Sequence, residues 1–169
     1  MRKGIIAAAC VATVVLFRVP ARADDGRMPL SGHWSFKLTN APTPVIASPP
    51  TFYVVAYGPS TDLSPLAPDT VQIVYAHTVT ITTQWAVAGD MLITMPNGDT
   101  LRAHLSGTAN PDPSVPVLAI DQSGKISGGT GLFRGARGAF VATGHVNLAT
   151  LAGAVTIDGW LALDDGERD

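Results

Sequence analysis

Short runs of β-branched and aromatic residues, separated by proline and glycine, are the feature that most limits how this chain can fold. The runs alternate with a period of two residues, which is typical of β-strands. They predict strands at residues 33–39, 52–57, 70–87, 90–95, 100–107, 115–121, 139–147 and 152–163. The run at 70–87 is too long for one strand, so it holds either two strands or one strongly bent strand. Eight or nine strands at this spacing predict an all-β antiparallel barrel or sandwich.

The composition agrees with one domain that contains a packed core. Of the 169 residues, 46% are hydrophobic and 14% are charged, and this length suits a single domain. One cysteine excludes a small disulfide-stapled scaffold. The composition also lacks the bias of a disordered charged tail, a coiled coil or a polytopic membrane protein.

The N-terminus has the pattern of a secretory signal peptide at residues 1–23. Arg2 and Lys3 precede an apolar run at 4–17, and Ala21-Arg22-Ala23 fits a cleavage site between small residues. A membrane anchor is the alternative, but this run is shorter than the roughly 18–20 residues that span a bilayer. We therefore expect a secreted or periplasmic protein.

Cleavage after residue 23 leaves a flexible N-terminal segment at 24–31, a barrel domain at 32–163 and an acidic tail at 164–169. It removes four of the 11 Lys and Arg and none of the 13 Asp and Glu, which leaves a net charge of −6. Nucleic acid and membranes are poor partners for such a chain, because both attract clustered positive charge. The mature chain has no cysteine for a disulfide.

Two segments predict the connections between strands. The segment at 42–68 carries seven prolines, which predicts loops that flank one edge strand at 52–57. This Pro-rich insertion either covers the mouth of the barrel as a lid or extends into solvent. Asn97-Gly98 predicts a type I′ turn with two positive-φ residues, which pairs 90–95 with 100–107.

Five glycines fall within residues 126–138. A phosphate-binding loop is excluded, because Arg134 stands where a third glycine belongs and no Gly-Lys-Ser/Thr sequence or helical pattern follows. The segment is instead predicted to be a structural turn, with Leu132 and Phe133 in the core. Its residues are Gly128, Gly129, Thr130, Gly131, Phe133, Gly135 and Gly138.

This turn, read as Gly128-Gly129-Thr130-Gly131, Phe133, Gly135-Ala136 and Gly138, resembles that of the allene oxide cyclase and dirigent-like barrels, in particular their secreted bacterial relatives. The hairpin at 97–101 and the sequence Asp158-Gly159-Trp160 extend the likeness over residues 97–163. The resemblance implies a single antiparallel eight-stranded barrel, calycin-like in form, with an apolar cavity and assembly as a homodimer or homotrimer. Enzymes of the family confine flexible apolar substrates, without a cofactor. No catalytic residue of the family aligns with this chain.

Strand alternation gives candidates for the cavity wall, since alternate residues face opposite sides of a barrel. The bulky, aromatic-rich faces supply Tyr53 and Tyr57 from one strand and Tyr75 and His77 from another. On the strand at 100–107, Arg102 and His104 share the polar face, which either lines the cavity or is solvated. Solvation is the expectation for that face.

Other types of site find no support in the sequence. The histidines outside the signal peptide, His33, His77, His104 and His145, form no H-x-H or H-E-x-x-H pair, so no metal site is expected. No G-x-S-x-G sequence marks a serine hydrolase. Trp34, Trp85 and Trp160 are expected in the core rather than as ligand platforms.

The sequence is compatible with two functions. The first is an exported barrel that binds an apolar small molecule in its cavity and has no evident catalytic motif. The second is a cyclase or isomerase that confines a flexible apolar metabolite, with the six candidate side chains nearest the substrate. A catalytic barrel of this kind needs few reactive side chains, so the sequence does not separate the two.

Overall fold

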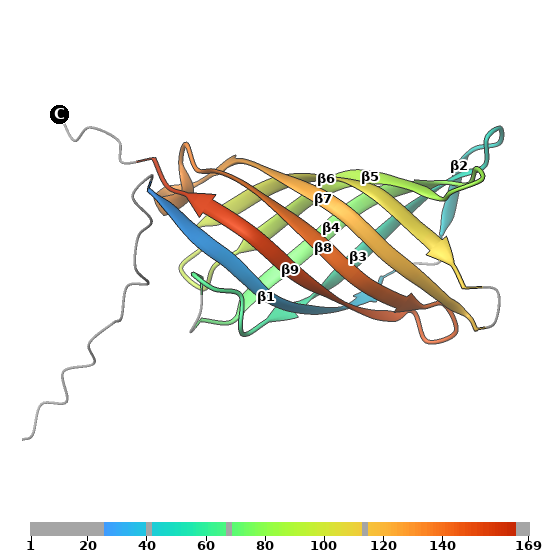
Figure 1. Cartoon of the computed structure of the whole chain (residues 1–169), viewed down its shortest axis with the longest axis horizontal. Helices are drawn as coiled ribbons and strands as arrows, with labels where there is room; N and C mark the ends of the chain where they lie inside the picture. The colour runs from blue at the N-terminus through green and yellow to red at the C-terminus, as the bar shows by residue number, and fades with distance from the viewer. Residues whose placement is uncertain (1–25, 40–41, 67–68, 113–114, 165–169) are drawn as a thin grey trace, which may run out of the picture.

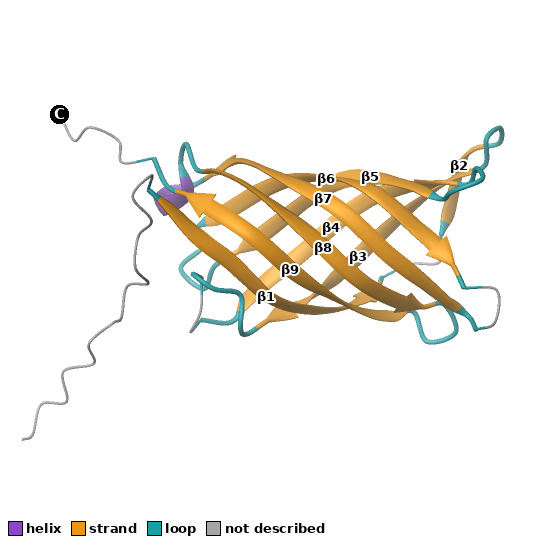
Figure 2. Cartoon of the chain, in the orientation of Figure 1, coloured by secondary structure: helices purple, strands orange, loops and turns teal. Residues whose placement is uncertain are grey.

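The computed structural model describes residues 26–39, 42–66, 69–112 and 115–164. They form a closed eight-stranded antiparallel barrel with one extra strand (Figures 1 and 2). The strand pattern left an antiparallel barrel or sandwich open, and the eight-stranded barrel implied by the family resemblance is confirmed. The predicted signal peptide at 1–23 and nearly all of the tail at 164–169 lie outside the described residues.

The sheet runs in the order β1-β9-β8-β7-β6-β5-β4-β3-β2, and β1 also pairs with β3. All pairings are antiparallel, and neighbours in sequence are neighbours in the wall from β2 to β9. The extra strand, β2, lies at one end of the barrel, and both described ends of the chain lie at the other (Figure 1). The strands are β1 (Arg27–Leu38), β2 (Thr43–Ile46), β3 (Thr51–Ser60), β4 (Val71–Thr80), β5 (Ala86–Thr94), β6 (Thr100–Pro111), β7 (Val117–Gly129), β8 (Arg137–Asn147) and β9 (Ala152–Ala162).

The barrel closes where β1 meets β3, through a ladder of two residue pairs, Lys37 with Tyr57 and Leu38 with Ala56. Side chains extend this short seam. The Trp34 indole N–H donates to the Gly58 carbonyl at 3.1 Å, and the Ser60 hydroxyl donates to the carbonyl of residue 33 at 2.6 Å. Backbone and side-chain hydrogen bonds together hold the two strands in register.

Inward residues alternate with outward residues along each strand, and they fill the end of the barrel that is remote from β2. Two loops also contribute to this packed end, with Leu63 from the β3–β4 connection and Phe133 from η1 (Gly131–Phe133). Their burial closes the barrel between the strand ends. The fully buried residues around them include Leu30, Val71, Ile73, Leu101 and Leu161.

The structure corrects two expectations for the first half of the chain. Residues 27–31, expected in a flexible segment, belong to β1 and pair with β9 from Arg27 opposite Ala162. The strand at 52–57 is not an edge, because β3 pairs with β4 along its whole length and with β1 and β2 on its other side. Of the described prolines in this region, most lie in loops or in β2, and Pro59 lies near the end of β3, opposite Gln72.

Two further strand expectations are refined. The run at 70–87 holds all of β4 and the first residues of β5, separated by a turn at 81–85. The hairpin at Asn97-Gly98 joins β5 to β6 as predicted. The predicted turn type, I′, is wrong. Only Gly98 has a positive φ there, 88°, and its N–H donates to the Met95 carbonyl. Pro96 fixes the first central position of a type I turn, so Gly98 takes the left-handed position that follows.

The Gly-rich segment turns between β7 and β8 at the packed end. Thr130 anchors it, because its hydroxyl accepts a hydrogen bond from the Thr100 N–H at 2.9 Å. The Asp99 carboxylate accepts another from the Leu132 N–H at 3.1 Å. Phe133 is buried as expected, but the core prediction for Leu132 is wrong, since this residue is 64% exposed.

Among the described residues, no helix is long and apolar enough to cross a membrane.

The short seam makes Gly58 sensitive to any side chain. A methyl group there would overlap the backbone carbonyl oxygen of Ser35 on β1. We expect Gly58→Ala to lower the free energy of unfolding by roughly 1–3 kcal/mol, because β1 must move away from β3. Urea denaturation measures this loss. The exposed Gln72→Ala change on β4 is the control, with an effect within about 0.5 kcal/mol; equal effects of the two changes would contradict this account of the seam.

Candidate functional site

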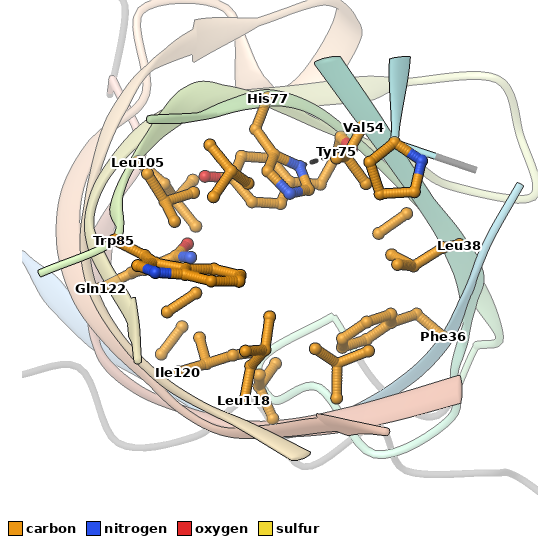
Figure 3. Close-up of a pocket in the computed structure, with 18 of the residues that line it drawn as sticks. Phe36, Leu38, Val54, Tyr75, His77, Trp85, Leu105, Leu118, Ile120 and Gln122 are labelled. Atoms are coloured by element: carbon orange, nitrogen blue, oxygen red, sulfur yellow. Dashed lines mark hydrogen bonds between the residues drawn. The ribbon is translucent and has the colours of Figure 1, made fainter. Parts of the chain in front are cut away.

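A cavity of about 280 Å³ occupies the half of the barrel toward β2 (Figure 3). Its inner wall comes from the barrel strands, and its rim includes the exposed residues Pro42 and Leu148. The cavity therefore opens at this end. Large side chains fill the opposite half of the barrel, so the two halves differ sharply in packing.

The cavity wall is apolar and rich in aromatic rings. It includes Trp34, Phe36, Phe52 and Trp85, together with many aliphatic side chains. No Lys, Arg, Asp or Glu from the described part of the chain lines it. Among the described lining residues, the polar side-chain groups are the two indole N–H groups and those of Tyr75, His77 and Gln122.

Tyr75 and His77 are two positions apart on β4, and both side chains line the cavity (Figure 3). Val71 and Ile73 are buried on the same face of this strand. Their rings stack with centroids 4.3 Å apart and planes 15° apart. The His77 Nδ1 lies 3.3 Å from the Tyr75 carbonyl oxygen. Because a carbonyl only accepts, Nδ1 is the donor, and Nε2 of the neutral ring carries a lone pair.

Burial controls the ionisation of both rings. It lowers the pKa of His77 to about 4, because the charged imidazolium loses hydration there, although the hydrogen bond to Tyr75 acts in the other direction. Burial also raises the pKa of Tyr75, and the charge of Asp90 raises it further. At neutral pH the cavity thus holds a neutral imidazole and a neutral phenol.

The Tyr75 hydroxyl is buried and has no hydrogen-bond partner among the described residues. An unpaired buried hydroxyl destabilises a folded protein by about 1–3 kcal/mol relative to a paired one. The stack on His77 and the surrounding core hold the ring in place despite this loss.

Gln122 is the third polar side chain of the wall and is 5% exposed. It lies on β7, where the inward-facing row also contains Leu118, Ile120 and Ile126. Its side-chain amide makes no hydrogen bond within the described part of the chain. The amide therefore has its full donor and acceptor capacity available inside the barrel.

Only two of the six candidates from the sequence line the cavity, Tyr75 and His77. The side chains of the other four lie on the outer face. The cavity placement of Tyr53 and Tyr57 is therefore wrong, whereas the solvation expected for the face of Arg102 and His104 is confirmed. Tyr53 and Tyr57 are 40% and 48% exposed, since β3 turns Phe52, Val54 and Ala56 inward instead. Arg102 is exposed, and His104 faces solvent beside Asp90, with Nδ1 and Oδ1 3.0 Å apart.

Sequence reasoning missed Gln122, Trp34 and Trp85 as wall residues. Gln122 lies one residue beyond the predicted strand at 115–121, so no face was assigned to it. The available signal was a single polar residue that continues the apolar alternation of Leu118 and Ile120. Trp34 is buried in the core, as expected, and Trp85 is half-buried against it, but both rings also line the cavity.

Two other features do not contribute to this site. The Gly-rich turn lies at the packed end, remote from the cavity, and its role there is architectural. The histidines are dispersed: His33 hydrogen-bonds to Asp62 with Nδ1 2.8 Å from Oδ2, and His145 is exposed. Within the described ranges, no three His, Cys, Asp or Glu residues come together as a metal site.

The fold is similar to that of solved dirigent proteins. The pterocarpan synthase dirigent protein GePTS1 superposes with a TM-score of 0.53 at 21% identity, covering 91% of this chain and 96% of that one. For the pterocarpan synthase dirigent protein PsPTS1 the TM-score is 0.48 at 17% identity, with 83% and 97% covered. No family model and no curated protein matches the sequence. The dirigent-like barrel fold is therefore supported, while the allene oxide cyclase likeness and a secreted bacterial origin stay predictions.

The unpaired hydroxyl of Tyr75 predicts an unusual effect of mutation. Tyr75→Phe keeps the ring stack and removes the unsatisfied group, so we expect the free energy of unfolding to rise by about 1 kcal/mol. Chemical denaturation measures it, with the exposed Tyr57→Phe as the control that changes nothing. A loss of stability in Tyr75→Phe would show that the hydroxyl has a partner in solution.

The lowered pKa of His77 predicts a loss of stability in acid. Below pH 6.5 the unfolded chain protonates this histidine, whereas the folded protein resists until about pH 4. The unfolding free energy of the wild type, relative to His77→Phe, should fall by roughly 2–3 kcal/mol as the pH decreases from 6.5 to 4. Urea denaturation across this range tests it, and NMR should place the His77 titration near pH 4. A constant difference, with titration near 6.5, would contradict burial of the ring.

Proposed function

We propose that this barrel binds an apolar small molecule in its cavity. The observation that carries the proposal is the contrast between the two halves of one barrel. Large aliphatic side chains fill one half, whereas the other half encloses about 280 Å³ behind an uncharged wall. Protein interiors normally pack without such voids, so a space of this size favours a bound ligand.

The size and surface of the cavity indicate the kind of ligand. Its volume of about 280 Å³ lies just below the usual range for small-molecule sites, about 300–1,000 Å³, so a compact molecule fits better than a long chain. The rings of Trp34, Phe36 and Trp85 offer flat apolar contacts. Burial of apolar ligand surface against this wall supplies the main driving force for binding.

Cyclisation or isomerisation of the bound molecule is the second candidate function. The stacked Tyr75–His77 pair favours it, because the imidazole Nε2 has a free lone pair and the phenol stays protonated. A neutral imidazole with a pKa of about 4 is a weak base, so catalysis here would depend mainly on confinement and orientation of the substrate. GePTS1, with the similar fold, carries the name of a synthase.

Filling the cavity should weaken ligand binding without unfolding the barrel. Ala109 lines the cavity, whereas Ala119 is exposed on the outer face. We expect Ala109→Phe to weaken binding of the neutral fluorescent probe N-phenyl-1-naphthylamine by about tenfold or more, because the new ring occupies the ligand's space. Fluorescence titration measures this, and circular dichroism confirms the fold.

The matched control is Ala119→Phe, which adds the same ring outside the barrel and should leave the affinity unchanged. Equal binding by the wild type and both variants would place the probe on the outer surface and contradict the cavity proposal.

A further inference from the structure

The wall of the cavity offers no compensation for a charged ligand. None of its residues in the described part of the chain is a Lys, Arg, Asp or Glu. A carboxylate that enters would lose its hydration and find no cation in exchange, which is strongly unfavourable in an apolar site. A neutral group of the same shape avoids this loss.

His77 does not supply the missing positive charge. Burial lowers its pKa to about 4, so the ring is neutral at pH 7. Its Nδ1–H already donates to the Tyr75 carbonyl at 3.3 Å. The remaining nitrogen, Nε2, presents a lone pair, which repels an anion and accepts a hydrogen bond from a neutral donor.

Gln122 provides the polar contact that a neutral ligand can use. Only 5% of this residue is exposed, its side chain lines the cavity, and none of the side-chain hydrogen bonds among the described residues involves its amide. On the adjacent strands Gln122 pairs with Gly107 and Ala142, so no large side chain covers it from either neighbour. Figure 3 shows Gln122 on the cavity wall, on the same side as Trp85.

We propose, building on the binding function above, that the cavity selects uncharged apolar molecules with an oxygen that hydrogen-bonds to the Gln122 amide, and rejects carboxylates. Ketones, ethers, alcohols and phenols are in this class, because the amide both donates and accepts. Free fatty acids and aromatic acids are outside it.

Three naphthalenes of nearly identical shape separate the contributions of charge and hydrogen bonding. They are the neutral ketone 2-acetylnaphthalene, the anion 2-naphthoate and the hydrocarbon 2-isopropylnaphthalene. Equilibrium dialysis at pH 7 gives the dissociation constant of each for the wild-type protein. We expect the ketone to bind at least tenfold more tightly than the anion.

Gln122→Leu tests the hydrogen bond, since leucine replaces the amide with an apolar group of similar size. This variant should bind the ketone about threefold to tenfold more weakly, while its affinity for the hydrocarbon stays the same or rises. Ser123→Ala, the next residue on the outer face of β7, is the control and should change neither affinity.

The contrary outcomes are distinct. Binding of 2-naphthoate as tight as that of the ketone overturns the charge selectivity in the wild type, whether or not the variant folds. An unchanged ratio of ketone to hydrocarbon affinity in folded Gln122→Leu overturns the role of the amide. If none of the three test compounds binds but N-phenyl-1-naphthylamine does, only this inference fails. If that probe also stays outside the cavity, the proposed function fails with it.

Discussion

Closure of the sheet between β1 and β3 is the constraint on which the rest of the structure depends. Two residue pairs and a few side-chain hydrogen bonds join the first strand to the third. Close approach of Gly58 to the β1 backbone allows this short seam to form. Once the wall is closed, the inward side chains of the described strands are largely shielded from water. The apolar interior, the unpaired Tyr75 hydroxyl and the lowered pKa of His77 all follow from this enclosure.

The distribution of side-chain volume along the barrel axis separates stability from function. At one end, Leu63 and Phe133 enter from loops and complete a dense core. At the other end, small wall residues such as Ala56, Ala109 and Ala142 leave a cavity. The polar groups Gln122 and His77 lie on the wall of this hollow half. A barrel that needed only stability would place larger apolar residues at these positions.

The strand pattern predicted an antiparallel barrel or sandwich, because period-two alternation is a local property of the sequence. The resemblance carried by the Gly-rich turn then favoured the barrel. The residues of the site were harder to predict from the sequence. On β3 both faces are apolar, with Phe52 and Val54 on one and Tyr53 and Tyr57 on the other, so alternation does not reveal which face is inside. On β4 the outer residue Gln72 breaks this symmetry, and Tyr75 and His77 were placed on the correct face. The inward placement of Gln122 depends on how far β7 extends, and the pairing of β7 with β6 and β8 determines that extent.

The most direct test of the central claim, that the cavity is a binding site, is native mass spectrometry of the protein purified gently from the organism that makes it. Denaturing extraction then identifies whatever was bound. Our account predicts one neutral, apolar, oxygen-containing metabolite per chain, released on unfolding. An empty protein whose mass and melting temperature do not respond to a panel of neutral phenolic and polyketide compounds would contradict it.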